Sequence, residues 1–204
     1  MSSRSHFNKR STLSPEQRLN RNFLVALYAK DTDGISAALS QGADIEVRDN
    51  NRETGLHWAS KEGHEEIVSF LLEKGADPNS TAYGDITPLH LAVDNNHTGT
   101  AARLITAGAN VNATNWLGLT PLHYAASNNG TETATLLSDS GADLDARDKE
   151  GRKPIDYAHK GEQVTALLEK AHSAQNASSV SGGEPVNLQA KQAPISRKTV
   201  LAMG

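Results

Sequence analysis

Apolar side chains along this chain recur at helical spacing in short segments that polar turns separate. One segment, residues 64–73, places its apolar side chains three to four positions apart, which predicts a helix with one buried face. Gly75 follows it, where glycine commonly ends a helix in the left-handed conformation. A partner helix is expected over residues 54–62. The apolar residues of the second helix are Ile67, Val68, Leu71 and Leu72.

Another helix is expected to begin at residue 14. Ser14 is followed three residues later by Gln17, which is the spacing of a capping box, and Pro15 occupies the first helical position. Apolar residues then fall one turn apart, so this helix also has one apolar face. These residues are Leu19, Phe23 and Leu27.

The same marker residues recur every 33 positions. Gly-Ala-Asp or Gly-Ala-Asn occurs four times at this interval, and a threonine, a leucine and a histidine keep the same register. Several markers in phase over several units identify internal repeats. The glycines are Gly42, Gly75, Gly108 and Gly141; the threonines are Thr54, Thr87 and Thr120; the leucines are Leu56, Leu89 and Leu122; the histidines are His57, His90 and His123.

The repeated unit resembles the ankyrin repeat, whose signature is Thr-Pro-Leu-His-x-Ala. Residues 87–92 read Thr-Pro-Leu-His-Leu-Ala, and residues 120–125 read Thr-Pro-Leu-His-Tyr-Ala. Residues 54–59 lack the proline, and residues 153–158 keep the proline but lack the histidine. The resemblance implies an all-α solenoid of stacked helix pairs joined by short hairpin-like turns, with the first and last units as caps. The units are expected at about 14–48, 49–81, 82–114, 115–147 and 148–171.

Composition agrees with a thin core and two tails. Hydrophobic residues make up 37% of the chain and aromatic residues 4%, too few for one thick core. Residues 21–171 carry a net charge of −9, whereas residues 1–20 carry +3 and residues 172–204 carry +2. Residues 1–13 are predicted to be a disordered basic leader, and 172–204 a disordered tail. The acidic middle disfavours direct binding to nucleic acid.

Several classes of site and location are excluded on the residues alone. The chain has no cysteine, so it has no disulfide, thiolate metal site or thiol nucleophile. No apolar run reaches the length of a membrane span, and residues 1–10 lack the apolar segment of a secretory signal. A cytoplasmic or nuclear location is therefore expected.

No enzyme, cofactor or metal is predicted. The chain lacks a P-loop, a Gly-x-Gly-x-x-Gly and a Gly-x-Ser-x-Gly motif. Equivalent positions of stacked repeats lie about 10 Å apart, too far for His57, His90 and His123 to share a zinc ion. The resemblance instead implies that each histidine bonds to its own threonine and to hairpin backbone.

What remains is a protein-binding surface. In the family, partners contact the hairpin tips and the exposed side of the first helix of each pair. Transferred to this sequence, the tip candidates are Asn51, Glu53, Tyr83, Ile86, Trp116, Leu117, Leu119 and Arg152, and the helix candidates are Lys61, Asp94, Asn95, Ser127 and Asn128. Exposed aromatic side chains beside aliphatic ones mark interfaces. The alternative is that Trp116 folds over the next hairpin and is mostly buried, whereas Trp58 and Tyr124 are expected to pack between repeats.

Two tips depart from the family pattern, so their shapes are expected to deviate. Arg52 replaces the usual hairpin glycine, and Gly84 comes one place early. The predicted function is a monomeric, non-enzymatic adaptor, scaffold or inhibitory subunit that binds another protein. The alternative is a secreted or translocated effector of a pathogen or symbiont, with the segment from Pro185 as its signal.

Overall fold

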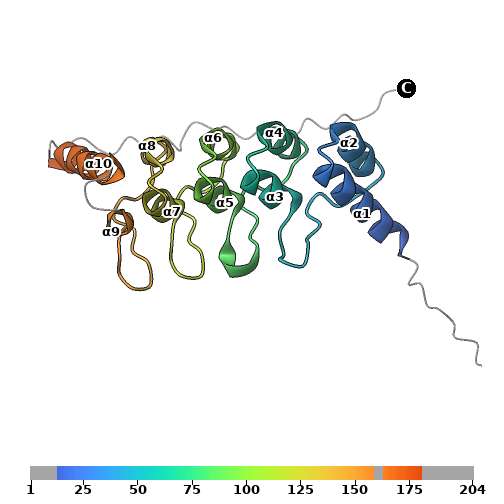
Figure 1. Ribbon diagram of the computed structural model, residues 1–204, viewed down its shortest axis with the longest axis horizontal. Helices are drawn as coiled ribbons and strands as arrows, with labels where there is room; N and C mark the ends of the chain where they lie inside the picture. Colours follow the sequence, from blue (N-terminus) through green and yellow to red (C-terminus); the bar gives the residue numbers. More distant parts are fainter. Residues whose placement is uncertain (1–12, 159–162, 181–204) are drawn as a thin grey trace, which may run out of the picture.

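The stack of helix pairs is evident in the computed structural model, which describes residues 13–158 and 163–180, with side chains to Ser173. These residues form ten α-helices and one short 3-10 helix, with no strand. Figure 1 shows the pairs in a row, with the hairpin loops of successive units extending to the same side. The predicted all-α solenoid of stacked helix pairs is confirmed.

Each unit contains two consecutive α-helices. The first unit holds α1 (Pro15–Tyr28) and α2 (Thr32–Ser40). The next three hold α3 (Gly55–Lys61) with α4 (Glu65–Glu73), α5 (Pro88–Asp94) with α6 (Thr98–Thr106), and α7 (Pro121–Ser127) with α8 (Thr131–Asp139). The last holds α9 (Pro154–Tyr157) and α10 (Gln163–Val180), and the 3-10 helix η1 spans Tyr83–Asp85.

Local sequence sets where these helices begin and end. The backbone N–H of Ser14 donates to Gln17 Oε1 at 2.9 Å, and that of Gln17 donates to Ser14 Oγ at 3.1 Å, which confirms the capping box. Thr87 caps α5, and Pro88 occupies its first position, where a missing N–H costs nothing. Gly75 has φ +93°, the left-handed conformation predicted for it after α4.

The core is thin because each unit contributes few large side chains. A leucine from the first helix and one from the second are buried in each central unit, and the alanine of the signature is fully buried between them. Small alanines let neighbouring helices approach closely, so each unit is covered by the next. The leucines are Leu56 and Leu71, Leu89 and Leu104, and Leu122 and Leu137; the alanines are Ala59, Ala92 and Ala125.

The disordered tail predicted from residue 172 is wrong for residues 172–180. Helix α10 runs on to Val180. Ser173 Oγ donates to the carbonyl of Glu169 at 2.8 Å, and most residues of this part of the helix are small or polar. This part has no apolar periodicity, which is why the sequence pattern missed it. The predicted leader and the remaining tail lie outside the described residues, apart from Leu13.

One position in each hairpin tip adopts the left-handed conformation. Gly118 and Gly151 both have φ +80°, and Arg52 has φ +60° and Asp85 φ +58°. The tip of the second unit therefore keeps the shared backbone conformation at this position, contrary to the expectation that Arg52 would change it. The tip of the third unit does deviate, because Gly84 is also left-handed, at φ +75°, within η1.

Alanine at Gly118 is expected to destabilise the protein more than alanine at Gly151. Both substitutions force a side chain into a left-handed conformation, which costs about 1 kcal/mol. A Cβ at Gly118 would also lie 3.1 Å from the Cα of Asp148 and the N of Lys149, whereas a Cβ at Gly151 meets nothing within 4 Å. Urea denaturation should show a loss of about 2–3 kcal/mol for Gly118→Ala, about twice that of the matched variant. Equal losses would contradict the close packing of these two hairpins.

Candidate binding surface at the hairpin tips

Three buried histidines hold each hairpin against the unit before it. His90 Nδ1 lies 2.9 Å from Thr87 Oγ1, and His90 Nε2 lies 3.1 Å from the carbonyl oxygen of Leu119. A carbonyl oxygen only accepts, so Nε2 carries the proton and Nδ1 accepts from the threonine. His57 bonds in the same way to Thr54 and Ile86, and His123 to Thr120 and Arg152. The expected bonds are present, and the hairpin backbone belongs to the following repeat.

Burial keeps these histidines neutral. Burial lowers the pKa of His57 to about 4, although its hydrogen bond to the Ile86 carbonyl acts in the opposite direction. Burial likewise lowers the pKa of His90 to about 4 and lowers the pKa of His123. Near neutral pH each ring therefore has one N–H to donate and one nitrogen to accept.

An Asp or Asn side chain shapes three of the four tips. Asn115 Oδ1 accepts the backbone N–H of Leu117 at 2.9 Å and that of Leu119 at 3.0 Å. Asp49 and Asp148 do the same in their own hairpins. The tip of the third unit has Ala82 at this position, and the side chain of alanine cannot accept a hydrogen bond. That difference accounts for the 3-10 turn in this tip alone.

Backbone hydrogen bonds join successive tips into a row. The N–H of Tyr83 donates to Asn51 O at 3.2 Å, and the N–H of Trp116 donates to Gly84 O at 2.9 Å. The N–H of Lys149 donates to Leu117 O at 2.9 Å. The two aromatic residues are therefore fixed at their backbones on adjacent hairpins.

The tips expose a small group of large side chains. Tyr83 is 63% exposed, Trp116 62% and Leu117 41%. A Cβ at Gly84 would lie 3.3 Å from Trp116 Cδ1, so the indole rests on the preceding hairpin. The alternative that Trp116 is mostly buried over the next hairpin is wrong. The predicted candidates Ile86 and Leu119 are only partly exposed.

The polar side chains predicted to contact a partner differ in how exposed they are and in whether they bond to one another. Asp94 and Asn128 are brought together, because Asn128 Nδ2 donates to Asp94 O at 2.6 Å and to Asp94 Oδ1 at 3.2 Å. Asn128 and Glu53 are partly buried. The candidates that remain exposed are Asn51, Lys61, Asp94, Asn95, Ser127 and Arg152.

Arg152 is engaged in the last hairpin. Its Nε lies 2.9 Å from Asp148 Oδ2, and its guanidinium carbon lies 4.7 Å from the centre of the Tyr157 ring. Burial alone would raise the pKa of Asp148. Hydrogen bonds from the Tyr157 hydroxyl, at 2.5 Å, and from Arg152 outweigh it and lower that pKa to about 2. Arg152 is therefore better explained as part of the cap than as a contact for a partner.

Arg52 is a tip residue that the list of candidates missed. Its guanidinium carbon lies 5.8 Å from the centre of the Tyr83 ring, on the neighbouring hairpin. The sequence signal was present, since Arg52 and Tyr83 flank equivalent tip positions of consecutive units. Trp58 and Tyr124 pack as expected: Trp58 lies edge-on to Tyr28 with ring centres 5.2 Å apart, and Tyr124 lies edge-on to His90 at 5.6 Å.

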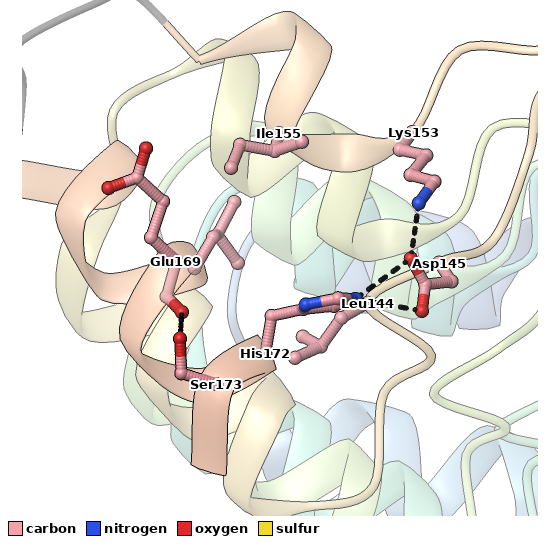
Figure 2. Close-up of a pocket in the computed structure, with 8 residues that line it drawn as sticks. Leu144, Asp145, Lys153, Ile155, Glu169, His172 and Ser173 are labelled. Carbon is pink, nitrogen blue, oxygen red and sulfur yellow. Dashed lines mark hydrogen bonds and ion pairs between the residues drawn. The ribbon is translucent and has the colours of Figure 1, made fainter. Parts of the chain in front are cut away.

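A hollow of about 320 Å³ lies at the other side of the last unit, between α10, α9 and the loop after α8. Figure 2 shows Asp145 at its edge, facing both Lys153 and His172. Asp145 lies 2.6 Å from Lys153 Nζ and 3.1 Å from His172 Nε2, and these hydrogen bonds lower its pKa, that from Lys153 most. Leu144, Ile155 and Leu168 form its apolar wall.

Asp145 is the last member of a series in which each residue bonds to the next repeat. Glu46 Oε1 accepts the N–H of Asp77 at 2.9 Å. Asn79 and Asn112 each accept a backbone N–H of the following unit at 2.8 Å. Asp145 occupies the same place in its repeat but bonds to Lys153 and His172. The hollow therefore marks the closure of the stack.

The described residues contain neither a cluster of metal ligands nor a membrane-spanning helix. They contain no group of three or more His, Asp or Glu residues that could hold a metal ion. None of the helices described is long and apolar enough to cross a membrane.

A comparison with protein families agrees with this architecture. The family model described as ankyrin repeats (3 copies) matches residues 23–115 and 103–178, well over half of the chain. The matched segments include the four units whose first helix has threonine or lysine at the N-cap position. The chain belongs to the ankyrin-repeat family.

Proposed function

We propose that this protein is a non-enzymatic adaptor, scaffold or inhibitory subunit that binds a partner protein through its hairpin tips. Ankyrin repeats are generally protein–protein interaction modules. The observation that supports the proposal is the pair of aromatic side chains on adjacent tips, Tyr83 and Trp116, each more than 60% exposed. Tryptophan and tyrosine are the residues that most often dominate the energy of an interface.

The surface is held in shape before a partner arrives. We call Tyr83, Asp85, Trp116 and Leu117 the tip surface. Its backbone is tied to the neighbouring hairpins, and the Trp116 ring already rests on Gly84. A preorganised surface loses less conformational entropy on binding, so a few anchors are sufficient for affinity. Asn51, Lys61, Asp94 and Ser127 are exposed at the sides and are suited to a polar rim.

Trp116→Ala is expected to weaken capture of the partner from an extract of the native organism by 30-fold or more, because loss of an anchor costs about 2 kcal/mol or more. The partner retained by the wild-type full chain is quantified against that retained by the variant. Thermal melting should change little, because 62% of the side chain is already exposed.

Val25→Ala provides the matched control. Val25 is 59% exposed and apolar but lies on α1, away from the tips. It should leave capture unchanged. Equal capture by all three proteins would remove the basis for a tip-mediated interaction, and a large loss of stability in Trp116→Ala would mean that the indole is structural.

A further inference from the structure

The third and fourth units carry almost no positive charge near their tips. Between Gly75 and Ala102 the chain has three aspartates and no lysine or arginine, and between Leu104 and Thr131 it has no charged side chain. The intervening Arg103 pairs with Glu65 at 3.0 Å, between α6 and α4. The charge that these units themselves place near their tips is therefore acidic, whereas Arg52 and Lys149 lie on the two flanking tips.

Asp85 lies within the tip surface and is available to a cation. Its side chain is exposed, and among the described residues its carboxylate has neither a hydrogen bond nor an ion pair. It follows Tyr83 by two residues on one hairpin, and the neighbouring hairpin presents Trp116. Aromatic faces attract cations, and a nearby carboxylate adds a charged hydrogen-bond acceptor.

The chain itself shows that this surface attracts a guanidinium group. Arg52 lies over the ring of Tyr83. The indole of Trp116 provides a stronger face for a cation than the ring of Tyr83 does. No cation lies over that indole among the described residues. The chemistry points to a basic residue flanked by apolar ones as the occupant.

The segment after Glu184 has this chemistry. It contains Lys191, Arg197 and Lys198 and no acidic residue, and the aliphatic Ile195 and Val200 lie two residues before and after the Arg-Lys pair. We propose that residues 195–201 dock on the tip surface of the same chain, with one cation of the pair against Trp116 and Asp85. This inference rests on the proposed function, since the segment would cover the surface until a partner displaces it.

The segment is long enough to reach the tips. Sixteen residues lie between Val180, the end of α10, and Arg197, and the seventeen extended steps from one to the other span about 55–60 Å. Two repeats correspond to about 20 Å along the stack, and all of α10 to about 27 Å. The connection can therefore return past α10 and arrive at the third and fourth hairpins.

Fluorescence of Trp116 tests the proposal in the full chain. The sequence has two tryptophans, so Trp58→Phe leaves Trp116 as the sole indole while keeping an aromatic ring against Tyr28. Adding Arg197→Glu with Lys198→Glu should raise acrylamide quenching of Trp116 roughly twofold, because the segment would no longer shield the indole. High salt should have a similar effect on the parent chain. Lys191→Glu, a matched reversal outside the segment, should leave quenching unchanged.

A synthetic peptide of residues 185–204, added to the charge-reversed chain, should lower the quenching again. Equal quenching in the parent and charge-reversed chains would overturn the proposal. So would quenching that changes with protein concentration, which would assign the segment to a second copy. If quenching is unaffected but partner capture still depends on Trp116, this inference fails and the proposed function stands.

Discussion

Replacing His90 with alanine is expected to lower the free energy of unfolding by about 3–5 kcal/mol. The ring is fully buried, so its removal leaves a cavity between α5 and the next hairpin. The backbone N–H of Thr87 loses its acceptor, and the carbonyl of Leu119 loses the donor that joins two repeats. Urea denaturation at pH 7, followed by circular dichroism, measures the loss.

His97→Ala is the matched histidine control. His97 is partly exposed between α5 and α6, and its Nε2 makes one hydrogen bond, to the carbonyl of Lys61, at 3.1 Å. Its loss should cost about 1 kcal/mol. His90→Leu restores volume without the hydrogen bonds and should recover part of the stability. If His90→Ala costs no more than His97→Ala, the buried bridge contributes little to the stack.

Acidification from pH 6.5 to about 4 is expected to destabilise the protein. The pKa of His57 and of His90 is lowered to about 4 in the folded chain, whereas an unfolded histidine titrates near 6.5. The unfolded state thus binds more protons across this window, so stability falls as the pH falls. Each of these two histidines should contribute on the order of 2–3 kcal/mol, and His123 should add in the same direction. Urea midpoints measured at pH 7, 5.5 and 4 report the change.

The loss of stability in acid can be assigned to particular residues by substitution and by the pH range in which it occurs. His90→Leu should be less stable at pH 7 but should lose less stability between pH 6.5 and 4, because one titrating group is gone. Asp148, with a pKa of about 2, contributes only as the pH falls from about 3.8 through 2. A profile that is flat between pH 7 and 4 would be incompatible with buried, neutral histidines.

The repeated parts of the fold were predictable because they depend on local chemistry. Thr87 and His90 recur at 33-residue intervals, and each residue acts through bonds within its own unit or to the backbone of the next. Backbone acceptors need no particular side chain, so the family signature is sufficient to place them. The ends of α3 and α4 accordingly fall within one residue of those predicted.

The features specific to this chain depend on pairs of residues in different units. The place where the Trp116 ring lies depends on Gly84, one hairpin earlier, and the shape of that hairpin depends on Ala82 lacking an acceptor. Both residues are visible in the sequence, but their effects appear only when the hairpins are packed side by side. The last part of α10 carries no repeated apolar pattern, so periodicity could not detect it.

The series from Glu46 to Asp145 has a consequence for how many repeats this architecture can hold. Each internal member needs only a main-chain N–H from its successor, which any inserted unit other than one with proline there would supply. A 33-residue cassette could therefore be duplicated or removed between Asn79 and Asn112 without redesigning a side-chain interface. The Lys153–Asp145–His172 cluster would then travel with the final unit as its terminator, independent of the length of the array.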